Sequence, residues 1–313
     1  MSATGQRSVT VFRVVRHAAY SASLLFGALL LAQIIFEAVP GDPARRVLGP
    51  YASQESVVHL RHELGLDRPL AERIGANILG ALRFDFGRSI IDGRGVRLEV
   101  MEKFTRTFSL GLQAVAIAAA LALALLALVH FVPRAAFLLP VARTPSVLPS
   151  FLSAVLLAIV AALWLPAVFG SSGSSRSFPA PLLPSLVAAI YPASVLVATL
   201  GARWTSLRSS PHYRTARAFG LGRSQLLLNA LLAPSSPAIL ALVIGQLSLV
   251  LFASLVVEII FSLPGTGTLM LASIQANDYP MLQGILIINA LVFIALHFLA
   301  ESLYPVLDPR VAR

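Results

Sequence analysis

The sequence predicts an all-α, polytopic membrane protein with six transmembrane helices, and three observations support this fold class. Of the 313 residues, 57% are hydrophobic and 12% are charged, and the mean hydropathy is +0.81, which is far too apolar for an ordinary soluble domain. Six runs of roughly 20 mostly apolar residues are long enough to cross a hydrocarbon core of about 30 Å as helices. The arginines fall in alternate connections between these runs, a pattern that indicates the orientation of a membrane protein.

The six apolar runs define the expected spans in chain order. The first run lacks a convincing small-residue cleavage site, so we interpret it as a retained anchor and not as a removed signal peptide. The third and fourth runs contain prolines, which kink or end helices but are tolerated where neighbouring helices satisfy the freed carbonyl groups. The predicted spans cover residues 18–36, 108–132, 147–169, 182–200, 238–261 and 281–299.

The net charge of +10 is distributed as a topology signal. Nearly all short-loop arginines lie before the first run, between the second and third, between the fourth and fifth, and after the sixth. They are Arg7, Arg13 and Arg16; Arg134 and Arg143; Arg203, Arg208, Arg214, Arg217 and Arg223; and Arg310 and Arg313. By the positive-inside rule both termini and the loop at about 202–234 are cytoplasmic. The charge therefore indicates membrane orientation, and no nucleic-acid partner is expected.

Residues 37–106 form the one sizeable polar segment, with ten of the chain's fourteen acidic residues beside eleven basic ones. On the predicted topology this segment is external, between spans one and two. Ser53 is placed to cap a helix that runs to about Leu64 and stops at Gly65, and a second helix is expected at about 69–82. The expected parts are a cytoplasmic N-terminus with the first span (1–36), the external helical segment (37–106) and a five-helix core (107–313).

The loop at 202–234 contains a short helix with clear ends. Ser209, Ser210 and Pro211 form a helix start, and the helix expected at about 212–219 stops at Gly220 or Gly222. Small residues would let another protein approach this helix closely, and arginines would bind carboxylates at the rim. The small residues are Ala216, Ala218 and Gly220, and the arginines are Arg214, Arg217 and Arg223. The loop is thus a docking element, the alternative being a solvated basic loop that only fixes topology.

Seven sequence blocks, in order, resemble a known family. They are PGDPA (40–44), ELGLDRPL (63–70), FDFGRSI (84–90), YRTARAFGL (213–221), VEIIFSLPGTGTL (257–269), DYPMLQG (278–284) and LYPVLDPR (303–310). Together they resemble the inner-membrane permease subunits of bacterial dipeptide, oligopeptide and nickel ABC importers. The resemblance covers most of the chain and implies a multi-pass protein of the bacterial cytoplasmic (inner) membrane.

The resemblance also implies a function and partners. The chain would form half of the translocation path for a small hydrophilic solute, most plainly a dipeptide or oligopeptide, with import of nickel or a metal chelate as the alternative. Its implied partners are a second homologous permease subunit, two cytoplasmic ATPase subunits and an external solute-binding protein, all acting in the lipid bilayer. ATP and Mg would be bound by the ATPases, since this chain has no GxxxxGK[ST] loop. No cofactor is expected in this chain.

Two groups of residues acquire roles from the resemblance. The first resembles the coupling helix that docks in a groove of the ATPase, and comprises His212, Tyr213, Arg214, Thr215, Ala216, Arg217, Ala218, Phe219, Gly220 and Leu221. The second group consists of polar residues within the spans, where such side chains are costly, and the resemblance makes them candidates to line the path. They are Gln113, Gln246, Glu258 and Asn289. For each of these four, helix-to-helix hydrogen bonding is an equally good interpretation.

The sequence departs from the family in two loops. The segment after Gly222 reaches Pro234 early and is more apolar than usual, and the connection at 133–145 is short, so the contact with the ATPase is expected to be smaller or differently shaped.

The polar residues allow two other interpretations, an enzyme site and a metal site. A polytopic intramembrane enzyme would need a buried nucleophile and base, for which Ser248 or Ser254 with His297 is the nearest set. His59 and His62 share a helix face but lack the carboxylates of a metal site, and both are expected to be surface residues. We therefore expect a transporter subunit and not an enzyme.

Overall fold

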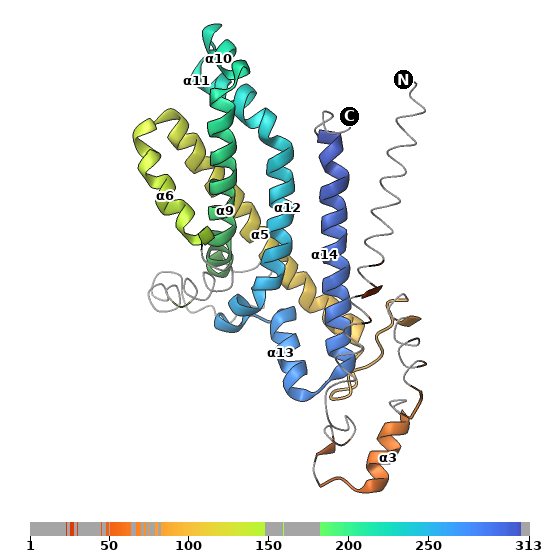
Figure 1. The fold of residues 1–313 in the computed structure, drawn as a ribbon. Helices are drawn as coiled ribbons and strands as arrows, with labels where there is room; N and C mark the ends of the chain where they lie inside the picture. The colour runs from red at the N-terminus through yellow and green to blue at the C-terminus, as the bar shows by residue number, and fades with distance from the viewer. Residues whose placement is uncertain are drawn as a thin grey trace, which may run out of the picture. The chain divides into compact units, whose positions relative to one another are not determined.

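The computed structural model describes residues 51–63, 83–147 and 182–307, with isolated positions between and before these ranges. The described residues form helices and turns, with one isolated β-bridge between Arg88 and Gly95, so the all-α prediction is confirmed for this part of the chain. The chain divides into two compact units, one of residues 1–105 with 268–298, the other of residues 106–267 with 299–313 (Figure 1). Helices α5, α13 and α14 each pass from one unit into the other.

Four helices of the described residues are long and apolar enough to cross a membrane: Val96–Phe131, Leu182–Ser209, Arg223–Ile260 and Tyr279–Ala300. They contain the predicted spans at 108–132, 182–200, 238–261 and 281–299 almost entirely. Each helix is longer than its apolar run at one end or both, because polar residues that flank the run can continue the helix once it has formed. The predicted spans at 18–36 and 147–169 lie almost wholly outside the described residues.

The first unit contains α3 (Gln54–Glu63), the start of α5 (Val96–Phe131), most of α13 (Thr266–Ala276) and most of α14 (Tyr279–Leu307). Helix α3 begins as the sequence predicts, because the Ser53 hydroxyl accepts a hydrogen bond from the Ser56 N–H at 3.1 Å. The helix expected at 69–82 falls largely outside the described residues. After α13 the chain turns sharply, and α14 runs back from the turn (Figure 1).

The core of this unit joins α5 to α14. Val96, Val100 and Ile285 are fully buried, and Met281 and Ile288 complete the cluster. Gly284 lies where a Cβ atom would come within 2.5 Å of a Val96 methyl group. The glycine in the DYPMLQG block is therefore required for close helix packing.

The second unit is a helical bundle with α9 (Leu182–Ser209) packed on α12 (Ala233–Ile260), on α6 (Leu138–Arg143) and on η2 (Thr144–Val147). The short helix η1 (Pro133–Phe137) links the end of α5 to α6. Both α9 and α12 continue through an internal proline, Pro192 and Pro237 respectively.

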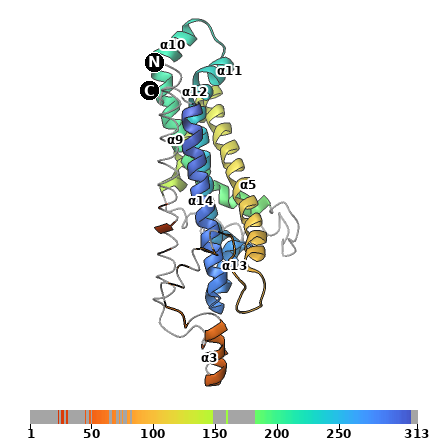
Figure 2. The same ribbon diagram turned by 90° about the vertical axis from the view of Figure 1, so that its right-hand side faces the viewer.

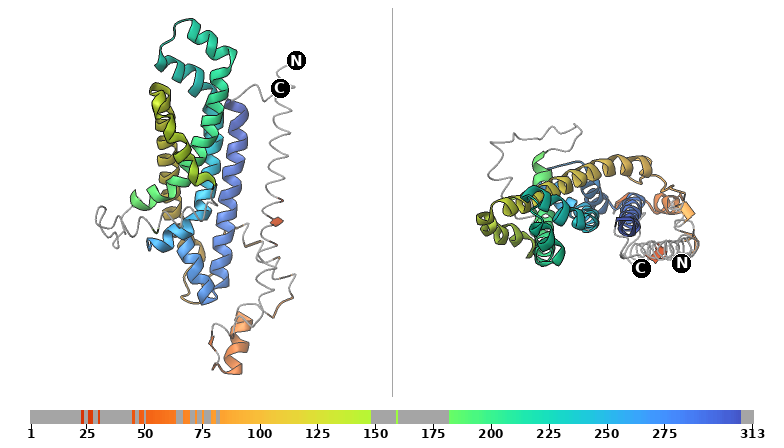
Figure 3. Two further views of the ribbon diagram at one scale, coloured as in Figure 1. Left: turned by 60° about the vertical axis from the view of Figure 1, so that its left-hand side comes forward. Right: turned by 90° about the horizontal axis from the view of Figure 1, so that it is seen from above.

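Helices α10 (Pro211–Ala218) and α11 (Arg223–Gln225) lead from α9 into α12. Figure 2 and the left panel of Figure 3 show them as an arch at one end of α9. Between α11 and α12 the helix takes the π form over Leu226–Leu232, labelled η3. This geometry is rare in proteins, and where it occurs it is often at a functional site. Segment η3 packs against α10, α9 and α12, so α10 rests directly on the start of a membrane helix.

Candidate functional site

Helix α10 is capped at both ends by local chemistry. At its start, Ser210 has extended backbone (φ −69°, ψ 150°), and its Oγ accepts a hydrogen bond from the Tyr213 N–H at 3.3 Å. Pro211 occupies the first turn, where its missing N–H leaves no carbonyl unsatisfied. At its end, Gly220 adopts φ +77°, and the Leu221 N–H donates to the Ala216 carbonyl at 3.4 Å, the pattern of a Schellman cap. The helix therefore has nearly the bounds that the sequence predicts, 211–218 against 212–219.

Most of α10 faces away from the bundle. Among the coupling-helix candidates, Tyr213, Ala216 and Leu221 are half-buried and the other positions are exposed. Phe219 is 80% exposed, so its ring is available to a partner protein, and aromatic side chains are frequent anchors of protein contacts. The exposed residues are His212, Arg214, Thr215, Arg217, Ala218, Phe219 and Gly220.

The structure refines the expected use of the small residues. Ala216 lies one turn from Tyr213 on the half-buried side of α10, so it serves packing within the chain. Ala218 is exposed and remains available for close approach. Gly220 has a left-handed backbone conformation, and glycine is needed there for the cap whatever its surface neighbours are.

The residues predicted to line the translocation path differ in burial and in hydrogen bonding. Gln113 of α5 is half-buried, and its Oε1 accepts a hydrogen bond from the Ser185 hydroxyl of α9 at 3.1 Å. Gln246 of α12 is 6% exposed, and its Oε1 has no hydrogen-bond partner among the described residues. Asn289, in the part of α14 that belongs to the first unit, is half-buried. Gln113 thus takes part in helix-to-helix bonding, and Gln246 keeps an unsatisfied acceptor.

Glu258 is at the centre of a buried polar cluster and is 1% exposed. Its Oε1 accepts from the Thr107 hydroxyl at 2.7 Å and its Oε2 from the Gly267 N–H at 2.8 Å. The Thr107 Oγ1 in turn accepts from the Thr266 N–H at 2.9 Å. Thr266 and Gly267 begin α13, so the two side chains satisfy N–H groups that a helix start leaves unpaired, and the carboxylate lies at the positive end of the helix. This geometry favours a structural role for Glu258.

The two glycines of the PGTGT stretch make the cluster sterically feasible. A Cβ atom on Gly265 would overlap the Glu258 carboxyl group. A Cβ atom on Gly267 would lie 2.6 Å from the Leu255 Cα and 2.9 Å from the Glu258 Oε2. Neither glycine needs a positive φ, so close approach is what requires them.

A second buried carboxylate organises the first unit. Asp278 is 4% exposed and accepts hydrogen bonds from the Ser89 hydroxyl and from the backbone N–H groups of Ile90 and Met281, the last two at 3.4 Å. It therefore ties the loop at 84–95 to the start of α14. In the same loop the Arg94 backbone N–H holds the pKa of Asp92 below its ordinary value, so this exposed carboxyl stays charged at neutral pH.

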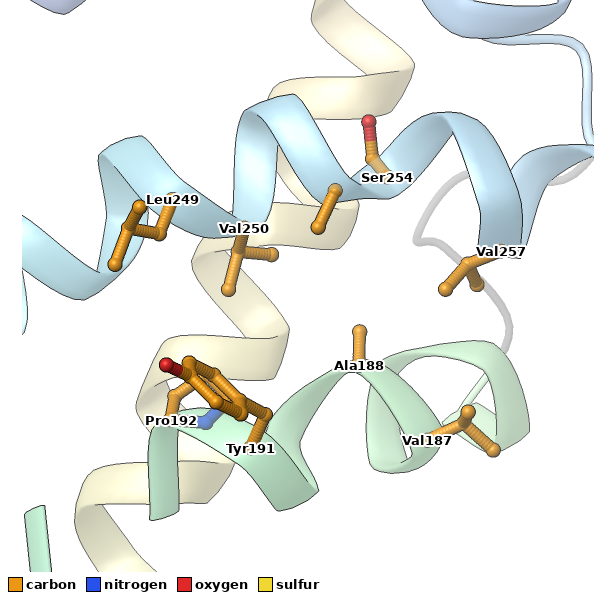
Figure 4. Close-up of a pocket in the computed structure, with 9 residues that line it drawn as sticks. Val187, Ala188, Tyr191, Pro192, Leu249, Val250, Ser254 and Val257 are labelled. Atoms are coloured by element: carbon orange, nitrogen blue, oxygen red, sulfur yellow. The ribbon is translucent and has the colours of Figure 1, made fainter. Parts of the chain in front are cut away.

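The α9–α12 contact contains a small apolar hollow, shown in Figure 4. It is lined by residues that include Tyr191 and Pro192 of α9 and Leu249, Ser254 and Val257 of α12. Its volume is about 20 Å³, enough for about one water molecule. The hollow is too small to bind a peptide.

The serines and the histidine of the enzyme interpretation each contact a carbonyl oxygen of their own helix. The Ser248 hydroxyl donates to the Ile244 carbonyl and the Ser254 hydroxyl to the Leu251 carbonyl, each within α12. His297 Nδ1 lies 3.1 Å from the carbonyl oxygen of the preceding turn of α14. No group of three or more His, Cys, Asp or Glu side chains that could hold a metal ion occurs among the described residues.

Sequence reasoning did not single out Thr107 or Ser89 for these roles. Thr107 precedes the apolar run of its span by one residue, and its partner Glu258 is 151 positions away. Ser89 and Asp278 are 189 positions apart. The glycines at 265 and 267 are the feature of the sequence that could have indicated the Glu258 cluster, because closely spaced glycines outside a turn indicate close approach of another group.

Comparison with known proteins matches residues 114–313 to the family described as binding-protein-dependent transport system inner membrane component. Over 308 residues the chain is 28% identical to a protein of Brucella abortus (strain 2308) named as a peptide transport system permease protein, and the alignment covers 95% of this chain and 98% of that relative. Over 295 residues it is 29% identical to GsiC of Escherichia coli (strain K12), named as a glutathione transport system permease protein, with coverage of 92% and 94%. The family match spans α9, α10, α12 and α14 as well as the second half of α5. The chain therefore belongs to the family of inner-membrane components of binding-protein-dependent transport systems, the ABC importer permeases that its seven sequence blocks resemble.

Proposed function

We propose that this chain is one permease subunit of an ABC importer and that α10 is the helix through which a cytoplasmic ATPase drives transport. The observation that carries the proposal is the form of α10, a short helix capped at both ends, exposed on its outer side and seated on η3 at the start of a membrane helix. The caps fix the form of this helix without help from the bundle, and an exposed aromatic side chain suits an anchor of a protein contact.

The mechanical route follows from the contacts of α10. Helix α10 packs on the end of α9 and on η3, and η3 continues into α12. When the ATPase closes on ATP, movement of α10 would be passed to these two membrane helices. A second permease subunit of the same family would complete the path, and an external binding protein would deliver the solute.

The solute proposed is a small peptide, either a dipeptide or oligopeptide or a peptide-like thiol such as glutathione. The choice of a peptide rests on the names of the relatives, which are those of a peptide and a glutathione transport system permease protein. A nickel or metal-chelate solute is the second candidate, and the relatives' names favour the peptide class over it. Retention of ligands by the cognate binding protein decides between them, since a binding protein that retains nickel and no peptide would contradict the main assignment.

Docking is tested by Ala218→Trp with Ala136→Trp as a matched control. Both alanines are exposed, and Ala136 lies in η1 outside the coupling motif. A bulky ring in a fitted contact costs about 1–3 kcal/mol, a loss of docking of about tenfold to a hundredfold. Co-purification of the ATPase with the permease pair and solute-stimulated hydrolysis are measured, with membrane level as the reference. Normal docking in Ala218→Trp would contradict the proposal. Gly220→Trp is unsuitable as a test, because it would also strain the left-handed cap.

A further inference from the structure

The end of α5 is joined to the arch of α10 and α11 through one histidine. His130 is the penultimate residue of α5, and its ring contacts Arg208 near the end of α9 and Arg223 at the start of α11. The His130 Nε2 lies 2.9 Å from the Arg223 carbonyl oxygen, and the His130 Nδ1 lies 3.1 Å from the Arg208 Nη2. The ring therefore links three elements of the same compact unit.

The two partners fix the protonation of the His130 ring. A carbonyl oxygen can only accept a hydrogen bond, so Nε2 carries the proton and donates to Arg223. A guanidinium group can only donate, so Nδ1 accepts from Arg208. The ring is thus neutral and uses one donor and one acceptor toward two different elements. A glutamine side chain offers the same pair of groups, whereas leucine and alanine offer neither.

A second hydrogen bond crosses the same junction in the opposite direction. The Arg223 Nη1 donates to the Phe131 carbonyl at 3.0 Å, and Phe131 is the last residue of α5. The last carbonyl groups of a helix have no acceptor role within the helix, and a cation beside them is favourable. The end of α5 is therefore bound in both directions to the residue that begins α11.

Helix α5 connects this junction with the Glu258 cluster. Thr107, which donates to Glu258, belongs to the same continuous helix as His130, and the rise of an α-helix separates the two by about 35 Å. Between them α5 also packs on α12, since a Leu251 methyl group lies 3.0 Å from the position that a Cβ atom of Gly111 would take. Movement could thus enter α5 either at His130 or through α12.

We infer that His130 is a positioning residue for coupled transport, through which movement of the arch passes to α5. The inference rests on the proposed function, because the movement begins when the ATPase closes on α10. Helix α10 contacts α9 and η3, and the His130 ring extends this route to a third membrane helix. Hydrogen bonds require alignment as well as distance, so a shift of α11 either moves the end of α5 or breaks the link.

Two fluorophore positions separate this route from the α12 route. Leu121 of α5 is 50% exposed and Leu249 of α12 is 45% exposed, so Leu121→Cys and Leu249→Cys are the same change at similar exposure. The chain has no cysteine of its own. Each variant carries an environment-sensitive fluorophore in the complete importer complex, reconstituted in nanodiscs. The change in emission on addition of ATP and Mg²⁺ is measured.

Four histidine substitutions are compared at both fluorophore positions. His130→Ala removes the link, His130→Leu fills space without polar atoms, and His130→Gln keeps a neutral donor and acceptor. His297→Ala is the matched control, because the His297 Nδ1 contacts the Phe293 carbonyl within its own helix, α14. The amount of ATPase that co-purifies with each variant shows whether docking is intact.

We expect both positions to respond to ATP when His130 is present. The response at position 121 should fall at least about fivefold in His130→Ala and His130→Leu, the lower end of coupling effects between sites, while the response at position 249 persists. His130→Gln should restore the response at position 121, and His297→Ala should leave both responses unchanged. A side chain that only filled space would be replaced by leucine better than by glutamine.

Other outcomes would overturn the inference in distinct ways. A full response at position 121 in His130→Ala would assign the movement of α5 to its packing on α12. Equal losses in His130→Gln and His130→Leu would show that the hydrogen bonds of the ring are not used. A response at position 249 alone, with His130 present, would overturn this inference and leave the proposed function standing. Absence of any response at both positions would contradict the proposed function itself.

Discussion

At the scale of single residues, Glu258 and Asp278 are buried acids that are both held by hydroxyl and backbone donors. Such donors stabilise a carboxylate in a buried site when geometry is good. Both acids belong to blocks that identified the family in the sequence. These blocks therefore encode junctions of the fold, in addition to any residue that contacts solute.

The Glu258 cluster predicts a large difference between two glycine substitutions. Gly265→Ala would drive a methyl group into the Glu258 carboxyl group, and overpacking costs about 1–3 kcal/mol of unfolding free energy. Gly245→Ala, within α12, meets nothing within 4 Å, and should be neutral or stabilising by about 0.5–1 kcal/mol. Thermal unfolding of the purified chain in detergent measures both. Equal midpoints for the two variants would show that the Gly265 contact does not matter.

The Asp278 cluster predicts the protease sensitivity of the loop at 84–95. Asp278→Ala leaves Ser89, Ile90 and Met281 without their acceptor. Trypsin should then cleave after the loop arginines at least about tenfold faster, since a hydrogen bond to a charged group contributes about 1.5–3 kcal/mol and 1.4 kcal/mol is tenfold.

Asp92→Ala is the control for this experiment. Asp92 lies in the same loop but is exposed, and its bonds to Arg94 stay within the loop itself. Its replacement should leave cleavage at Arg88 nearly unchanged. If Asp92→Ala and Asp278→Ala were cleaved alike, the anchoring role of Asp278 would be wrong.

At the scale of elements, the sequence predicted α10 well because its ends are set by neighbours in sequence. A serine before a proline begins the helix and a glycine ends it. The π-helical segment η3 could not be predicted, because its sequence LLLNALL gives the same apolar pattern in an α or a π turn. The Glu258 and Asp278 junctions escaped prediction for another reason, since their partners are more than 150 positions away.

The N-cap of α10 should contribute to the stability of this helix, which amide hydrogen exchange measures. Ser210→Ala removes the acceptor of the Tyr213 N–H, and loss of an N-cap costs about 1 kcal/mol. Backbone amides at 212–219 should exchange with deuterium about fivefold faster, and Ser210→Asp should restore protection. Ser209→Ala serves as the control, because its hydroxyl donates to the Ser206 carbonyl at the end of α9 and not to α10. Faster exchange in both alanine variants would mean that the whole loop frays and that the cap is not responsible.

At the scale of the whole molecule, the four described spans agree with the apolar runs of the sequence, and the orientation remains a prediction from the arginines. The chain has no cysteine, so single cysteines can report the side of the membrane without background. Val58→Cys, at a 61% exposed position of α3, should react with an impermeant thiol reagent from outside the cell. Thr215→Cys in α10 should react only after the membrane is opened. Labelling in the reverse order would invert the topology.

Insertion of α10 into the ATPase can be tested by truncation of its exposed aromatic side chain. Phe219 of α10 is 80% exposed and Phe137 of η1 is 71% exposed, so Phe219→Ala and Phe137→Ala are the same change at similar exposure. If Phe219 is an anchor of the contact, its truncation costs at least about 2 kcal/mol, which is about thirtyfold in affinity. The affinity of the ATPase for permease complexes reconstituted in nanodiscs is measured for both variants. We expect a loss of about thirtyfold in Phe219→Ala with wild-type affinity in Phe137→Ala, whereas equal affinities in the two variants would show that α10 does not insert into the ATPase through Phe219.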